Sequence, residues 1–311
     1  MTGFELIHIR VRIEKTNGLW LTALLMIKKV LVKIILTAIL CAAAVSVQAQ
    51  PAQVAEPDAA IPWQRLADGL ELGTFRAALI SETGDSMITI LRIDPARYRF
   101  RLLNASATTK GELLSAKQWC RQYGLVAAIN ASMYQTDYKS SVSLMVRPGH
   151  INNPRLSKDM TVLAFDRLSS DVPPVKIIDR QCEDFRFWQK KYATLVQSIR
   201  MISCTGKNVW QQQPRKWSTA AIATDQDGRV LFVHVRSLYT THDLINILQS
   251  LPVRIARAMY AEGGPQAQLY VQTGKHELEF NGSHLNQNNV KLLSWPIPNV
   301  IGISLRDQPT E

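Results

Sequence analysis

The sequence predicts an α+β fold, with a single domain in which a few helices flank a mixed, mostly antiparallel sheet. Two observations support this fold class. Apolar runs of strand length recur along the chain with turn residues between them, and only three segments show helical spacing. The composition does not change between residues 62 and 311, so we expect one domain there.

The first 61 residues are expected to lie outside this domain. The segment that begins at Met26 has three lysines, a short apolar run and then small residues before position 50, the pattern of a secretory signal peptide. We therefore predict that residues 1–49 contain the signal peptide, which begins at Met26 if translation starts there, and that the mature protein is periplasmic or secreted. The apolar run is shorter than the roughly 20 residues of a membrane span, so none is expected after cleavage.

A flexible linker is predicted at 50–61, which is rich in Ala, Pro and Gln. The domain then opens with three strands, which we expect to form an antiparallel meander, at residues 70–80, 86–95 and 98–105. Helical spacing predicts a helix at 111–124 that stops at Gly124, and the apolar run 125–130 predicts a buried strand.

The middle of the chain alternates hairpins with one short helix. Pro148 and Gly149 predict the turn of a hairpin over residues 141–151. An aromatic-rich segment at 183–192 is expected to be a short helix. Three further apolar runs predict strands at residues 161–166, 175–179 and 195–202.

The last part of the domain contains the longest predicted helix. The tetrapeptide DQDG joins predicted strands at 218–224 and 229–235 as a hairpin. The helix at 241–251 connects two strands, so it could make one strand pair parallel. The remaining strands are predicted on either side of Glu262 and at 299–305.

The cysteines and the charge limit the possible functions. Export would place Cys120, Cys182 and Cys204 in an oxidising compartment, where we expect Cys182 and Cys204 to pair. None has CxxC spacing, and neither a metal nor another cofactor is predicted. Residues 1–49 contain six basic and two acidic side chains, so the formal charge of +11 becomes +7 after cleavage. The basic residues are scattered, and the export signal argues against a nucleic-acid partner.

Polar residues follow apolar runs at three places that could carry chemistry. They are the segment from Asn130 to Tyr134, Ser198 with Arg200, and Glu262 with two glycines. Each has an ordinary structural explanation: Glu-Gly-Gly suits a hairpin turn, Asn130 suits a turn or cap, and the arginines suit the surface. His234 within an apolar strand is expected to be a core residue rather than a catalytic base.

In this order the segments resemble the phosphodiester glycosidase family, the N-acetylglucosamine-1-phosphodiester α-N-acetylglucosaminidase-like domains. The matching stretches are INASMY, VQSIRMI, an arginine before STAAIATDQDGRVLFV, YAEGGPQAQLYV and the closing PIPNVIGI. The resemblance extends from about Trp63 to Leu305. Glu262 stands where many members have Asp, and Ala131-Ser132 stands where the lysosomal type has two glycines, which places the chain in a bacterial branch.

The resemblance implies hydrolysis of a sugar whose anomeric oxygen belongs to a phosphodiester. The departing phosphate is a stable anion, so it needs less protonation than the leaving group of an ordinary glycoside. Glu262 would then be the catalytic carboxylate, together with Asn130. The sugar and phosphate would be bound by side chains and main-chain N–H groups of the other matching residues, which are Ser132, Tyr134, Ser198, Arg200, Arg215, Gly263 and Gly264.

We therefore expect an exported hydrolase that acts on phosphodiester-linked envelope or extracellular glycans. The alternative is a non-catalytic periplasmic glycan-binding or assembly factor on the same fold. Either function predicts that four residues distant in sequence meet around one pocket, namely Asn130, Ser198, Arg215 and Glu262. Tyr134 and Tyr138 could stack on a sugar ring or pack in the core. The sequence leaves the sugar and the oligomeric state open.

Overall fold

Three antiparallel sheets and three α-helices make up the part of the chain that the computed structural model describes, residues 63–283 and 294–306. These residues belong to the compact unit Ala60–Glu311. The predicted signal peptide, its cleavage site after Ala49 and the linker lie outside the described residues. Among the described helices, none is long and apolar enough to cross a membrane.

The largest sheet has seven strands and carries the site discussed below. Its order is β1-β2-β3-β13-β12-β14-β11. Along the chain the strands are β1 Gln64–Ala67, β2 Leu70–Arg76, β3 Met87–Ile93, β11 Arg200–Ile202, β12 Trp217–Asp225, β13 Val230–Tyr239 and β14 Ile255–Gly263.

Two five-stranded sheets complete the fold. One has the order β7-β6-β10-β8-β9 and the other β16-β15-β5-β17-β4. The strands of the first are β6 Met145–Arg147, β7 His150–Asn153, β8 Thr161–Arg167, β9 Val175–Asp179 and β10 Tyr192–Ser198. Those of the second are β4 Tyr98–Asn104, β5 Ala127–Asn130, β15 Gln268–Gln272, β16 Glu277–Asn281 and β17 Asn299–Leu305.

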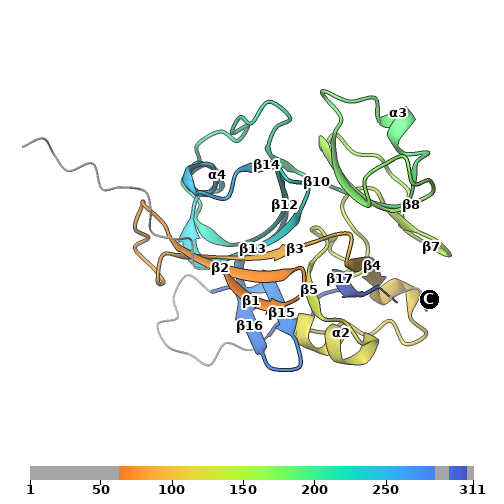
Figure 1. Cartoon of the computed structure of the whole chain (residues 1–311), viewed down its shortest axis with the longest axis horizontal. Helices are drawn as coiled ribbons and strands as arrows, with labels where there is room; N and C mark the ends of the chain where they lie inside the picture. The colour runs from red at the N-terminus through yellow and green to blue at the C-terminus, as the bar shows by residue number, and fades with distance from the viewer. Residues whose placement is uncertain (1–62, 284–293, 307–311) are drawn as a thin grey trace, which may run out of the picture. The chain divides into compact units, whose positions relative to one another are not determined.

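The three sheets, which Figure 1 shows as ribbons, contribute side chains to one shared core. Phe100 of β4, Phe165 of β8 and Phe232 of β13 come one from each sheet, and the ring centroid of Phe100 lies 6.1 Å from each of the other two. Alternation along β12 explains why the seven-stranded sheet is buried on both faces. Ile222 belongs to this shared core, while Ala223 faces a second core that includes helix α4 Thr241–Ser250.

The predicted antiparallel character is confirmed, but the single mixed sheet is wrong. The described strands form three sheets, and their pairs are all antiparallel. The parallel pair that helix α4 could have created is absent from these sheets because β12 lies between β13 and β14 and pairs with both. Containment of residues 62–311 in one domain stays a prediction.

Two predicted strands have a different long-range arrangement from the one expected. Strand β4 leaves the opening meander and pairs with β17, the last strand. The run 195–202 is interrupted at Ile199, so β10 pairs with β8 while β11 pairs with β14 in another sheet. Ile199 therefore connects the end of β10, in a five-stranded sheet, to the start of β11, in the seven-stranded sheet.

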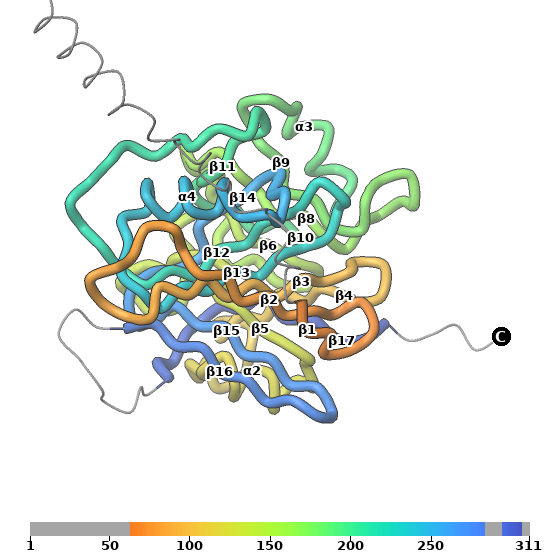
Figure 2. Tube along the Cα trace, turned by 60° about the vertical axis from the view of Figure 1, so that its left-hand side comes forward, coloured from red at the N-terminus to blue at the C-terminus, as the bar shows by residue number. Residues whose placement is uncertain are grey.

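Local signals in the sequence placed the turns correctly, but two helices are shorter than predicted, at 116–123 instead of 111–124 and at 185–188 instead of 183–192. Gly149 has φ 72° between β6 and β7, and the hairpin at Asp225–Gly228 joins β12 to β13. Helix α2 Ala116–Tyr123 ends at Gly124, which has φ 62°. Helix α3 Phe185–Trp188 is the predicted short helix, and the N-cap of α4 is Thr240, one residue before the expected first turn. Figures 1 and 2 show α2 and α4 on opposite sides of the seven-stranded sheet.

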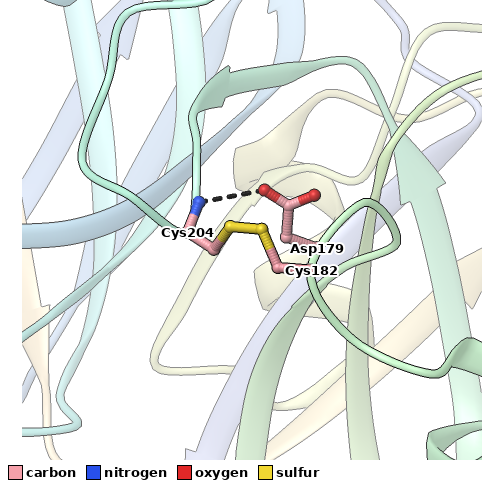
Figure 3. A group of neighbouring side chains, drawn as sticks. All are labelled: Asp179, Cys182 and Cys204. Carbon is pink, nitrogen blue, oxygen red and sulfur yellow. Dashed lines mark hydrogen bonds between the residues drawn. A yellow bond between two sulfur atoms is a disulfide. The ribbon is translucent and has the colours of Figure 1, made fainter.

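The predicted disulfide between Cys182 and Cys204 is confirmed, with the two Cα atoms 6.5 Å apart. It closes a loop of the chain that contains α3. Asp179 lies beside the sulfurs in Figure 3, and its carboxylate accepts a hydrogen bond from the main-chain N–H of Cys204 at 2.9 Å. The two thiol groups are consumed in the disulfide, so this group of three potential metal ligands is a covalent and hydrogen-bonded link.

Candidate active site

Glu262 lies near the end of β14, at an irregularity in its pairing with β12. Ala220 is paired with Glu262 and Ala221 with Tyr260, so Ala261 is an extra residue in β14. Such a β-bulge bends the strand and changes the direction of the side chains that follow it. Tyr260 and Glu262 are two residues apart in β14, so they face the same side of the sheet, and both line one pocket.

That pocket has a volume of about 900 Å³ and lies at the end of the seven-stranded sheet. Its wall is largely apolar and aromatic, with two carboxylates, Glu82 and Glu262, and two basic side chains, Arg215 and Lys216. The lining residues are Glu82, Met133, Ile199, Trp210, Pro214, Arg215, Lys216, Trp217, Leu238, Tyr260, Glu262, Gly263, Gly264, Pro265 and Ser283.

The Glu262 carboxyl is partly exposed and has few partners. Its Oε1 accepts a hydrogen bond from the adjacent main-chain N–H of Gly263 at 2.9 Å. Within the described ranges no lysine or arginine forms an ion pair with it. Burial raises the pKa of Glu262 to about 7, and the Gly263 hydrogen bond only partly offsets that effect. A carboxyl with this pKa exchanges its proton near neutral pH, which suits acid–base or nucleophilic chemistry.

The two basic side chains at the pocket differ in their availability. Lys216 Nζ lies 3.2 Å from Glu82 Oε2. Arg215 is exposed, and its guanidinium forms no ion pair or hydrogen bond with any residue that the structure describes. A free guanidinium can bind two oxygens of a phosphate at once. Arg215 is therefore the basic group best placed to receive an anion.

The two glycines after Glu262 do not form the turn of a hairpin. Strand β14 pairs with β12 and β11, whereas β15 pairs with β5 and β16 in a different sheet. The hairpin explanation of Glu-Gly-Gly is therefore wrong. Gly264 has φ 67°, in the region that favours glycine, and it begins a 3₁₀ turn, Gly264–Gln266.

The Asn130 side chain fixes that turn through two hydrogen bonds to main-chain groups. Its Nδ2 donates to the main-chain oxygen of Gln266 at 2.9 Å, and its Oδ1 accepts from the N–H of Gln268 at 2.7 Å. Asn130 is buried and is not among the residues that line the pocket. Its amide fixes the segment that carries Gly264 and Pro265, and its predicted catalytic role stays a prediction.

Ser132 and Ser198 are also buried and bonded to main-chain oxygens. Ser132 Oγ donates to Gln197 at 3.1 Å, and Ser198 Oγ donates to Tyr260. Neither serine lines the pocket. Of the four residues expected around one pocket, Arg215 and Glu262 therefore line it, while Asn130 and Ser198 support its wall.

Arg200 is neither a surface charge nor a residue of the pocket lining. Its Nη1 lies 2.9 Å and 3.1 Å from the two carboxylate oxygens of Asp179, which is fully buried. Its main-chain oxygen accepts a hydrogen bond from Trp210 Nε1 at 2.6 Å. Arg200 thus positions an aromatic wall residue, and its guanidinium is already engaged by a carboxylate.

Tyr134 lies close enough to the site to be affected by its charge. Burial, followed by the charges of Glu262 and Tyr138, raises the pKa of Tyr134 to about 12. The rings of Tyr134 and Tyr138 are 5.9 Å apart, and Tyr138 is exposed. Met133, not Tyr134, is the residue of this segment that lines the pocket. As expected, His234 is a buried core residue, and its Nε2 lies 3.2 Å from the oxygen of Ala267.

The polar segments did not by themselves predict the aromatic wall formed by Trp210, Trp217 and Tyr260. The rings of Trp210 and Tyr260 are 5.8 Å apart and inclined at 37°. Aromatic faces of this kind stack on sugar rings and on other apolar groups. Tyr260 stands directly before the AEGG segment and Trp217 directly after Arg215-Lys216, so proximity to those segments was an available signal.

Comparisons with known proteins agree with this fold and identify the family. The family model described as phosphodiester glycosidase matches residues 123–304. The catalytic domain of zebrafish N-acetylglucosamine-1-phosphodiester α-N-acetylglucosaminidase, in a structure auto-inhibited by its pro-peptide, superposes with a TM-score of 0.57 at 12% identity, over 78% of this chain and 86% of that one.

A hypothetical protein from Synechocystis superposes with a TM-score of 0.50 at 14% identity, over 77% of this chain and 63% of that one. No curated protein matches the sequence. At these identities the structures show a shared fold, whereas the family model covers more than half of the chain and includes Asn130, Ser198, Arg215 and Glu262. The chain belongs to the phosphodiester glycosidase family.

Proposed function

We propose that this protein is an exported hydrolase that releases a sugar from a phosphodiester in envelope or extracellular glycans. The observation that carries the proposal is an unpaired carboxyl, Glu262, with a pKa of about 7 inside a pocket that also contains the free guanidinium of Arg215. Support also comes from membership of the family, whose name states this class of reaction.

The chemistry follows from the leaving group. Breaking the bond between the sugar and the phosphodiester releases a phosphate monoester, which departs as a stable anion. One carboxylate acting on water or on the anomeric carbon is therefore sufficient, and the second carboxylate of an ordinary glycosidase is not needed. Arg215 would bind the phosphate oxygens, and the aromatic wall would contact the sugar. The proposal includes a signal peptide within residues 1–49, with translation starting at Met26. Such a signal peptide would account for export.

Glu262→Gln tests the proposal because it keeps the size and one hydrogen-bond acceptor while removing the ionisable group. Turnover of an N-acetylglucosamine-1-phosphodiester, or of a phosphodiester-linked polysaccharide, should fall by about 10²–10⁴-fold while substrate binding persists. Arg215→Met should instead raise KM, by about tenfold. Binding without turnover in both the natural protein and Glu262→Gln would contradict hydrolysis and support the non-catalytic alternative.

A further inference from the structure

Tyr260 carries a hydroxyl that the protein itself does not use. The residue is 5% exposed and lines the pocket. Its hydroxyl forms no hydrogen bond with any residue in 63–283 or 294–306. A tyrosine hydroxyl in such a shielded position normally has a partner. This one is available to a group that enters the pocket.

The position of Tyr260 is fixed on several sides. Its main-chain oxygen accepts from Ser198 Oγ, and its N–H donates to the oxygen of Ile199 at 2.9 Å. Its ring packs against Trp210, which Arg200 anchors through the 2.6 Å hydrogen bond. A donor held in this way is oriented before any ligand arrives, which is the arrangement that makes electrostatic stabilisation effective.

Gly263 makes room for this hydroxyl. A Cβ added to Gly263 would lie 1.9 Å from Tyr260 Oη. The backbone of Gly263 is extended, with φ −133° and ψ 169°, a conformation that any residue adopts, so space alone requires the glycine. Burial and the charge of Glu262 raise the pKa of Tyr260 far above its usual value, so the phenol keeps its proton.

We propose that Tyr260 donates a hydrogen bond to a phosphate oxygen of the substrate beside Glu262. Residue 263 is a glycine because any side chain there would collide with the Tyr260 hydroxyl. This inference rests on the proposed function, since it assigns a further contact in the same pocket. A phosphodiester oxygen only accepts hydrogen bonds, and its negative charge grows as the bond to the sugar breaks. Arg215 can balance that charge against the repulsion of the Glu262 carboxylate.

Binding of dimethyl phosphate tests this contact without requiring turnover. The probe would be titrated into the natural protein, into Tyr260→Phe and into Tyr192→Phe, with ³¹P line broadening as the readout. Tyr192 is the matched control because its hydroxyl donates to Pro173 at 2.8 Å in a different core cluster. Tyr260→Phe should weaken binding by about tenfold or more, with no change in Tyr192→Phe. Affinity for methyl N-acetylglucosaminide, which lacks phosphate, should be unchanged.

Turnover supplies the second readout. With a sugar phosphodiester, kcat of Tyr260→Phe should fall by about 10²-fold while KM changes less. The inference is overturned if the natural protein does not bind dimethyl phosphate, or if Tyr260→Phe binds it equally well. Equal binding of the probe by Tyr260→Phe and the natural protein overturns the inference whatever the other assays show. Weaker binding of the sugar by Tyr260→Phe would then mean that Tyr260 contacts the sugar. A shifted midpoint of the pH–rate profile would mean that Tyr260 acts on Glu262.

Failure of this contact can be distinguished from failure of the proposed function. If the protein binds dimethyl phosphate through Tyr260 but hydrolyses no phosphodiester, the proposed function is contradicted and the Tyr260 contact is supported. If the protein hydrolyses phosphodiesters, and Tyr260→Phe equals it in both probe binding and turnover, the Tyr260 contact is contradicted and the proposed function is supported.

Discussion

Glu262 and Asp179 are both carboxylates near the end of a strand, but Glu262 is partly exposed, Asp179 is fully buried, and their surroundings are opposite. Asp179 accepts hydrogen bonds from the Arg200 guanidinium and from the main-chain N–H groups of Gln181 and Cys204. Glu262 has one main-chain donor, from its own neighbour, and opens on a pocket. The comparison separates a carboxylate that stabilises the fold from one whose unsatisfied charge costs stability and is available for chemistry.

The largest effect on folding should come from Asp179→Asn. This change leaves the Arg200 guanidinium, which is 13% exposed, without its counter-charge. Breaking a buried ion pair on one side should lower the free energy of unfolding by about 3–5 kcal/mol. Urea denaturation measures this, with Glu262→Gln as the partner variant, for which no loss is expected. Equal losses in both variants would remove the distinction between the two carboxylates.

The pH dependence of stability should distinguish the Glu262 carboxyl by sign. Its pKa is about 7 in the folded protein, raised from the ordinary value of 4.5 that it takes in the unfolded chain, so the folded protein holds this proton more tightly. The group therefore stabilises the fold fully below about pH 4.5, and that contribution is lost as the pH rises to about 7. Between these limits the advantage of Glu262→Gln over the natural protein in free energy of unfolding should grow by about 3 kcal/mol.

Activity should follow the opposite direction, because hydrolysis needs the ionised carboxylate. Below pH 7, kcat/KM should rise by about tenfold per pH unit and then level off. Rates and urea denaturation would be measured in the same buffers. A rate profile whose midpoint lies near pH 4.5 would show that burial does not perturb Glu262.

A smaller effect is expected from Gly263→Ala, which adds one carbon atom beside the Tyr260 hydroxyl and next to Glu262. The added Cβ would collide with the Tyr260 hydroxyl, and overpacking of this kind costs about 1–3 kcal/mol. Gly274→Ala is the control, since no atom lies within 4 Å of its Cβ position. Thermal unfolding should show the loss only at Gly263, and Tyr260→Phe in the same chain should restore part of it. An additive double variant would contradict the proposed clash.

Features set by neighbouring residues could be predicted from the sequence. The turn at Gly149, the helix end at Gly124 and the strand at Asn299–Leu305 depend on backbone preference and on alternation within a few residues. The pairing of Cys182 with Cys204 was also expected and is confirmed. For the site, the order of the polar segments identified Glu262 and Arg215, which line one pocket.

The partners of those segments could not be predicted in the same way. The break at Ile199 divides one apolar run between two sheets, and the bulge at Ala261 interrupts the pairing of β14 with β12. Strand pairing and bulges are settled by contacts between residues far apart in sequence, which no local pattern specifies.

The sequence by itself determined the mostly antiparallel strands, the family and the chemical types that meet at the site. Only the tertiary structure decided the partners of the other residues. Asn130 and Ser198 form hydrogen bonds with main-chain groups, Arg200 forms an ion pair with Asp179, and Tyr260 lines the pocket. The physical reason is that a polar side chain forms its bonds with whichever groups the packed sheets bring within about 3 Å, and those groups lie tens of residues away along the chain.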